Sequence, residues 1–205
     1  MKELDINTWN RKEHFEHFSK LKDPYFGITI PFNVTKTYAF SKDNKVSFFG
    51  TYLHACMQAI NGVENLKYRI VDDKVVIFNS INASATIMRE NKTFGFSYID
   101  YNENLDLFLS NFQDEKQRIN TSSNLFPPKN GLDCIHCSAL PWSDFSGHKE
   151  PVSGLQESVP KLAFGKVKEV NNEKIMNVAI NVNHALVDGY HLSLFSELFQ
   201  KKLNK

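Results

Sequence analysis

The chain has 205 residues, 41% of them hydrophobic and 23% charged, and its formal net charge is +1. This length suits a single domain, expected over 1–205, that buries a core without disulfides. The small net charge argues against nucleic acid or an acidic membrane surface as a partner. The polar start, the absence of an apolar run of about 18 residues and the three cysteines favour a cytoplasmic protein with no membrane span.

The first half of the chain mixes helical and strand patterns. Asn10 and Glu13 have the spacing of a capping box, and apolar residues follow them at helical spacing. Asp72 and Asp73 divide a later apolar run into a hairpin. In chain order we predict a short strand over 4–6, a helix over 10–21, a strand over 25–34, a helix over 47–61 and a hairpin over 68–78.

The second half continues the mixture, with more hairpins. In chain order we predict a strand pair over 84–99, a helix over 102–120, a strand over 133–140, a loop over 143–158, a hairpin over 161–184 and a helix over 190–204. Asn171 and Asn172 form the turn of the long hairpin. Because helices and hairpins are interspersed, we expect an α/β (α+β) domain with a mixed, largely antiparallel sheet covered by helices.

The stretch "NVAINVNHALVDGYH", 177–191, holds two of the seven histidines. Alternation along the strand places His184 on its apolar face, where partial desolvation favours the neutral imidazole that a general base needs. Asp188 and Gly189 then form a turn and begin a helix. Taken alone, such a histidine is more often a hydrogen-bonded core residue, and such an aspartate more often a turn or cap residue.

Three segments, in order along nearly the whole chain, resemble one family. "NHALVDGYH" resembles the HHxxxDG signature of the chloramphenicol acetyltransferases, which wider acyl-CoA-dependent acyltransferases share. "NTWNRKEHFEHF", 7–18, resembles the family's opening W-x-R-[RK]-E-H-F, and 125–145 resembles its segment LFP…LPW-x-x-F. Asn183 stands where the signature has its first histidine.

The resemblance implies a two-layer fold and transfer of acetyl from acetyl-CoA to a hydroxyl of chloramphenicol, a reaction that gives antibiotic resistance. It implies direct transfer in a ternary complex, without a metal. His184 would be the general base, Ser138 the donor to the oxyanion, and Asp188 the partner of Arg11 in a buried salt bridge. It also implies a homotrimer whose active sites lie between subunits.

The acceptor pocket implied by the resemblance departs from the family in several places. Its residues would be Phe18, Phe26, Phe94, Phe96, Phe126, His148 and Ala163. Phe18 replaces a tyrosine, Phe96 a small residue, and Ala163 a threonine that holds a water; His148 and Glu150 replace apolar residues. Two alternatives therefore stay open: an acetyltransferase for another small-molecule acceptor, or an inactive homologue that only binds acyl-CoA or a small molecule.

One possible metal motif is set aside. Cys134 and Cys137 with His136 have the spacing of half a zinc site, but no second pair lies near them in the sequence. On a strand the two cysteines point to opposite faces, so they cannot hold one ion together.

Overall fold

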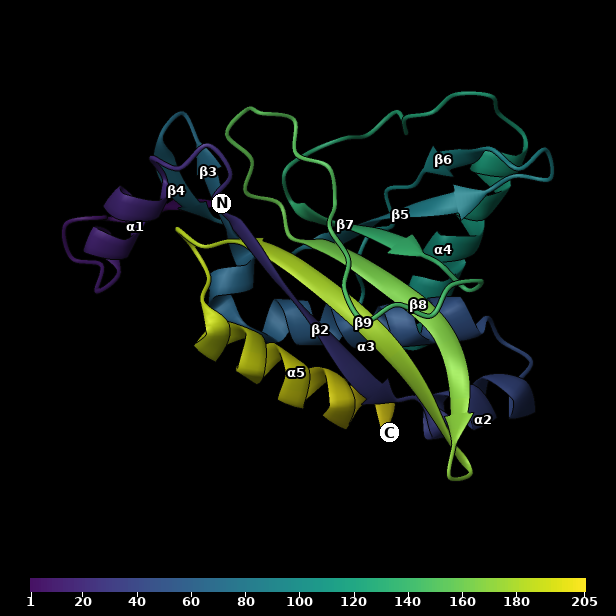
Figure 1. The fold of residues 1–205 in the computed structure, drawn as a ribbon. Helices are drawn as coiled ribbons and strands as arrows, with labels where there is room; N and C mark the ends of the chain where they lie inside the picture. The colour runs from purple at the N-terminus through teal and green to yellow at the C-terminus, as the bar shows by residue number, and fades with distance from the viewer.

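Six strands form the main sheet of the computed structural model, which describes residues 1–205 (Figure 1). Their spatial order is β2 (Tyr25–Asn33), β9 (Glu173–Asn183), β8 (Lys161–Val170), β7 (Cys134–Ala139), β5 (Asn82–Met88) and β6 (Phe94–Phe96). The β5–β7 and β7–β8 pairs are parallel, and the other pairs are antiparallel. The prediction of a mixed, largely antiparallel sheet is confirmed.

A separate small sheet joins β1 (Lys2–Glu3), β4 (Lys74–Ile77) and β3 (Tyr68–Val71), with a 3₁₀ turn over Glu64–Lys67 before β3. The predicted hairpin is confirmed: Asp72 and Asp73 both have positive φ, 49° and 62°, as a tight hairpin turn requires. The strand predicted over 4–6 is wrong. The first strand lies two residues earlier, and pairing with β4 ends once the Leu4 N–H has bonded to the Val75 carbonyl.

Helices cover one face of the main sheet (Figure 1). They are α2 (Thr35–Asp43), α3 (Phe48–Gly62), α4 (Leu105–Asn120) and α5 (Gly189–Leu203), whereas α1 (Lys12–Phe18) lies off one end of the sheet, beside the small sheet (Figure 1). α3 is buried almost all round because α2, α4 and α5 all pack against it. Its start is capped by Ser47, whose hydroxyl accepts the Gly50 N–H at 3.1 Å. No helix is both long and apolar enough to cross a membrane.

Two helices differ from the prediction. α1 is shorter than the predicted range and has no capping box, because Arg11 occupies its N-cap position without a side-chain cap bond. α2 was not predicted, since its sequence lacks a clear apolar stripe. It is held by tertiary contact instead: the buried Thr37 hydroxyl donates to the Leu203 carbonyl at 2.6 Å.

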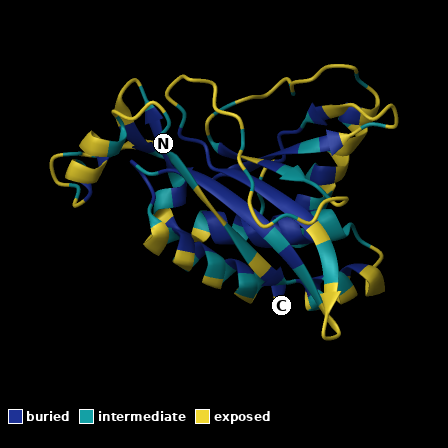
Figure 2. Cartoon of the chain, viewed as in Figure 1, coloured by how far each residue is buried: buried dark blue, intermediate teal, exposed yellow.

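The two faces of the main sheet have different surroundings. Val178, Ile180 and Val182 of β9 lie in the core against the helices, while Asn181 and Asn183 point to the other face. That second face, here called the open face, is crossed by the largely exposed segment 140–160 between β7 and β8 (Figures 1 and 2). The sequence-predicted site residues lie at one end of the sheet and on this face.

Candidate active site

His184 lies directly after β9, with its ring held on three sides. Its Nδ1 is 3.1 Å from the Val187 carbonyl oxygen. Because a carbonyl can only accept, Nδ1 carries the hydrogen and Nε2 keeps its lone pair. Phe18 stacks on the imidazole at 3.9 Å between ring centroids, and Phe26 packs against it at 4.5 Å. The half-buried ring is therefore held in a tautomer that can accept a proton at Nε2.

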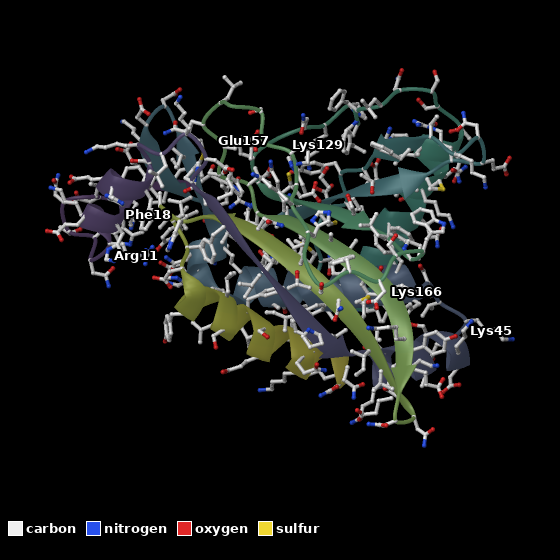
Figure 3. The ribbon with its side chains drawn as sticks, viewed as in Figure 1. Arg11, Phe18, Lys45, Lys129, Glu157 and Lys166 are labelled. Atoms are coloured by element: carbon white, nitrogen blue, oxygen red, sulfur yellow. The ribbon has the colours of Figure 1, made fainter.

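Arg11 ties the N-terminal segment to the turn that follows His184. Its side chain is 9% exposed, and its guanidinium forms an ion pair through Nη1 with Oδ2 of Asp188. Its Nη2 also donates to the backbone carbonyl of His184 at 3.2 Å. Figure 3 shows Arg11 and Phe18 together at the end of the sheet where α1 lies. The predicted ion pair is thus present, and it fixes the backbone on both sides of the turn.

Asp188 and His191 form a capping box at the start of α5. The Asp188 carboxylate accepts the Tyr190 N–H at 3.0 Å, and His191 Nδ1 accepts the Asp188 N–H at 3.1 Å. That nitrogen also lies 2.8 Å from Oδ1 of Asp188, a contact that suits a protonated ring. Burial and the positive charge of Arg11 together lower the pKa of His191 by more than Asp188 raises it, so we assign a neutral ring that accepts the backbone N–H at neutral pH. This gives His191 a structural role that its sequence did not show.

Replacement of Asp188 by asparagine should destabilise the fold by about 1–3 kcal/mol at pH 7, because it removes a charged hydrogen-bond partner of Arg11. Burial alone would raise the pKa of Asp188, but the charge of His191 once its ring is protonated in acid, the charge of Arg11 and the hydrogen bonds from both residues outweigh burial and lower it. A carboxyl with a lowered folded pKa stabilises the fold above its unfolded pKa of about 4, and loses that effect as the pH falls.

The measurement is the free energy of unfolding in urea at pH 7 and at pH 3 for the wild type and Asp188→Asn. The difference between the two proteins should shrink at pH 3. A difference that stays constant with pH would contradict the assigned ion pair. Asp144→Asn, which affects an exposed pair with Lys168, is the matched control and should change stability little.

Asn183, the departure from the family signature, is 2% exposed and fully bonded. Its Nδ2 donates to the Glu157 carbonyl at 2.7 Å, and its Oδ1 accepts the Ala185 N–H at 2.9 Å. The side chain therefore joins the end of β9 to the loop before β8. An amide, with a donor and an acceptor at one end, suits both bonds.

Ser138 lies near the end of β7 and lines a cavity of about 240 Å³ on the open face. Phe96 and Phe126 line the same cavity, with their rings stacked at 5.4 Å. Phe94 packs edge-on against Phe96 but does not line the cavity. Ala163 pairs with Ser138 across the β7–β8 ladder and is fully buried.

A second cavity, of about 210 Å³, adjoins the first, since both are lined by Glu150 and Lys161. His148 lines the second cavity, as does Asn181 of β9. Sequence reasoning missed Lys161 and Asn181 as site residues. Alternation along β8 and β9 could have placed them on the open face, but only strand pairing shows that they are direct neighbours.

The predicted site residues form two separate groups, one around His184 and one around Ser138. Ser138 pairs with Ala163, and Ala163 pairs with Ala179, which precedes His184 by five residues. Five residues along a strand and two strand spacings across the sheet place the Cα atoms of Ser138 and His184 about 20 Å apart. One copy of the chain therefore does not bring the imidazole and the hydroxyl together.

The chain is similar to known proteins over nearly its whole length. The family model for chloramphenicol acetyltransferase matches residues 1–200. "Chloramphenicol acetyltransferase 3" of Escherichia coli is 26% identical, over 98% of this chain and 96% of its own length. The chloramphenicol acetyltransferase of Bacillus pumilus is 30% identical, over 96% of this chain and 90% of its own. A solved structure of a chloramphenicol acetyltransferase superimposes with a TM-score of 0.87 at 26% identity, covering 98% of this chain and 99% of that one.

The family match and the fold thus define an enzyme of the acyltransferase class. Within that class, the chain belongs to the chloramphenicol acetyltransferase family.

Proposed function

We propose that this protein transfers the acetyl group of acetyl-CoA to a hydroxyl of chloramphenicol in the cytoplasm, with His184 as the general base. The observation that carries the proposal is the bond of His184 Nδ1 to the Val187 carbonyl, which leaves Nε2 free to accept a proton. The names of the relatives supply the reaction and the acceptor.

The proposed reaction needs one proton carrier. Nε2 of His184 removes the proton of the acceptor hydroxyl as its oxygen attacks the thioester carbonyl of acetyl-CoA. The new C–O bond forms in a tetrahedral intermediate, whose oxyanion accepts a hydrogen bond from the Ser138 hydroxyl. The C–S bond then breaks, and the coenzyme A sulfur takes the same proton back from His184. A well-placed base of this kind contributes about 100- to 10,000-fold to the rate.

Arg11 and Asp188 act as positioning residues in this proposal. Arg11 contacts both the His184 carbonyl and the Asp188 carboxylate, so it supports the backbone that carries the base. Neither side chain needs to exchange a proton. The aromatic residues divide between the two groups: Phe18 and Phe26 face His184, while Phe96 and Phe126, backed by Phe94, face the cavity at Ser138.

We further propose that the active form is a homotrimer with its active sites between subunits. The separation of about 20 Å between Ser138 and His184 within one chain supports this, because a base and an oxyanion donor must both lie within about 3 Å of the reacting atoms. Two copies of the chain can meet this requirement when the His184 end of one faces the open-face cavity of the next.

The proposal is tested by release of free coenzyme A thiol when the protein is mixed with acetyl-CoA and chloramphenicol. The wild type should release thiol, and Ser138→Ala should lower kcat about 100-fold because the oxyanion loses a donor. Ser146→Ala, on segment 140–160 and outside both cavities, should leave kcat unchanged. No thiol release by the wild type would refute the proposed function.

Mixing two inactive variants tests the arrangement of the sites. Ser138→Ala and His184→Ala chains are unfolded, combined in equal amounts and refolded together. Each shared site then has about a one-in-four chance of receiving an intact serine from one chain and an intact histidine from its neighbour, so about a quarter of wild-type activity should return. Recovery no greater than the sum of the separately refolded variants would show that each site is built from one chain.

A further inference from the structure

The first cavity on the open face, of about 240 Å³, is bordered by aromatic rings and by a carboxylate. Phe96 and Phe126 form its aromatic side, with ring centroids 5.4 Å apart. Glu150 lines it from segment 140–160, and Ser138 lines it from β7. An acceptor whose hydroxyl reacts at Ser138 therefore shares this small space with the carboxylate.

The Glu150 carboxylate has no hydrogen-bond partner and no cationic partner within the chain. The nearest basic nitrogen is Nε2 of His148, which lies 3.7 Å from Oε1 of Glu150, beyond hydrogen-bond distance. Lys149, the adjacent cation in the sequence, lies 3.3 Å from Asp23 instead. Glu150 is nevertheless well covered, since only 22% of its side chain is exposed.

His148 does not balance the charge of Glu150, because its ring is held in the neutral form. Its Nδ1 is buried and has no hydrogen-bond partner. A protonated imidazole carries a hydrogen on both nitrogens, so protonation would bury a charged donor without an acceptor. An unpaired buried group is more costly when it is charged than when it is neutral.

The other titratable groups of the first cavity add no net charge. Lys161 forms an ion pair with Glu157, which Figure 3 shows on the segment that lies over the sheet. The Lys161 ammonium also donates to the Pro151 carbonyl at 2.7 Å. Burial lowers the pKa of His136, and the charge of Lys161 lowers it further, so this ring is neutral at pH 7. The space around Ser138 thus carries one unbalanced negative charge.

A carboxylate beside aromatic rings is a combination that attracts cations. A positive charge near Glu150 gains Coulomb attraction, which is stronger at a covered site than in bulk water. A cation over the face of an aromatic ring, within about 6 Å of its centroid, is attracted to the ring as well, and quaternary ammonium groups are bound in this way. A neutral acceptor would gain neither attraction, and it would displace water from the carboxylate without replacing it.

We propose that the acceptor site selects alcohols that carry a quaternary or protonated ammonium group over neutral alcohols of the same shape. Glu150 holds the cation beside Phe96 and Phe126 while the hydroxyl reacts at Ser138. This inference rests on the proposed acetyl transfer and deepens it, since it names the charge of the preferred acceptor. Glu150 is a specificity-determining residue here and takes no part in the proton transfer.

The test compares alcohols that differ only in charge. One series is choline and its homologues with longer carbon chains. The other is 3,3-dimethylbutan-1-ol and its homologues, in which a tert-butyl group replaces the trimethylammonium group. Neither end group can be acetylated, so thiol release from acetyl-CoA reports on the hydroxyl alone and gives kcat/KM for each alcohol.

At the best chain length the wild type should prefer the cation by about 5- to 50-fold, between the effects of an exposed and a buried charged contact. Added sodium chloride should reduce this preference, because dissolved ions screen the attraction. Glu150→Gln keeps the size of the side chain and should abolish the preference, while kcat/KM for the neutral alcohols stays within about two-fold. Glu150→Lys should reverse the preference.

Asp144→Asn is the matched control, because it removes a carboxylate from the same segment but outside both cavities. It should keep the preference for the cation. Equal kcat/KM for the two series in the wild type, or a preference for the cation that survives in Glu150→Gln, would overturn the inference. Acetylation of chloramphenicol in the same assay would leave the proposed function standing.

Binding decides the inference where turnover does not. If chloramphenicol is acetylated but these alcohols are not, their inhibition constants against chloramphenicol replace kcat/KM. If nothing is acetylated, the proposed function fails, and calorimetric binding of the two series is measured instead. Tighter binding of the cations by the wild type, lost in Glu150→Gln, would support the site. Equal or weaker binding of the cations would overturn it.

Discussion

Replacement of His184 by alanine is expected to lower kcat for acetyl transfer by about 100- to 10,000-fold, because in the proposed mechanism His184 carries the proton from the hydroxyl to the sulfur. The ring is half-buried at the end of a strand and contacts Phe18 and Phe26 without lying in the central core. The variant should therefore fold. Thiol release measured under saturating acetyl-CoA and acceptor gives kcat directly.

The matched control is His17→Ala. His17 also packs edge-on against Phe18, at 4.9 Å between ring centroids, but it is exposed and lies on α1. Its removal should leave kcat within about two-fold of the wild type, as expected for a surface site. Equal rates for His184→Ala and the wild type would show that the proposed base is wrong, and an unfolded His184→Ala protein would be recognised by circular dichroism. In that case His184→Gln, which keeps a donor for the Val187 carbonyl, is the second variant.

Replacement of Arg69 by leucine is expected to destabilise the fold by about 3–5 kcal/mol, since each buried carbonyl that loses its donor costs about 1–3 kcal/mol before the structure relaxes. Arg69 is fully buried with no carboxylate partner, and burial lowers its pKa to about 10, so it is still charged at neutral pH. Its guanidinium donates to four backbone carbonyls, those of Leu66, Tyr68, Leu132 and Cys134. Without it these buried acceptors lose their donor, and the start of β7 loses its anchor to β3.

The free energy of unfolding in urea measures this effect. Arg89→Leu is the control, because Arg89 also donates to several backbone carbonyls but is partly exposed, so water can replace its bonds. We expect Arg89→Leu to lower the free energy of unfolding by about 1 kcal/mol or less. An equally small loss of the free energy of unfolding for Arg69→Leu would contradict the role of Arg69 as a buried donor to the four carbonyls. Arg69→Lys should remain clearly destabilised, since an ammonium group cannot match the planar arrangement of the four bonds.

Arg69 also shows what sequence reasoning overlooked. A single arginine in the strand "YRIV" gives no sign that it is buried, because its acceptors are backbone carbonyls from segments more than 60 residues away as well as its own neighbours. Backbone carbonyls have no sequence signature. The same holds for α2, whose helix depends on contact with the end of α5.

Local sequence patterns, by contrast, predicted the tight turns from their Asp and Asn pairs and most strands from their alternation. Asp72 and Asp73, and likewise Asn171 and Asn172, adopt the positive φ that such residues accept more readily than others. The capping box predicted at Asn10 was wrong because the motif is short and common, and in α1 the N-cap position falls to Arg11. A box does form at Asp188, with His191 in the place usually taken by Glu or Gln.

The sequence by itself determined most of the helices and strands, though not α2 or β1, together with the family and the segments that hold His184, Ser138, Arg11 and Asp188. It could do so because alternation, turn chemistry and short motifs are local properties of the chain. Only the tertiary structure decided that His184 and Ser138 lie about 20 Å apart in one chain. It also decided that Lys161 and Asn181 adjoin under the 140–160 segment. Strand register, which sets both distances, depends on pairing between segments far apart in sequence, and no single segment encodes it.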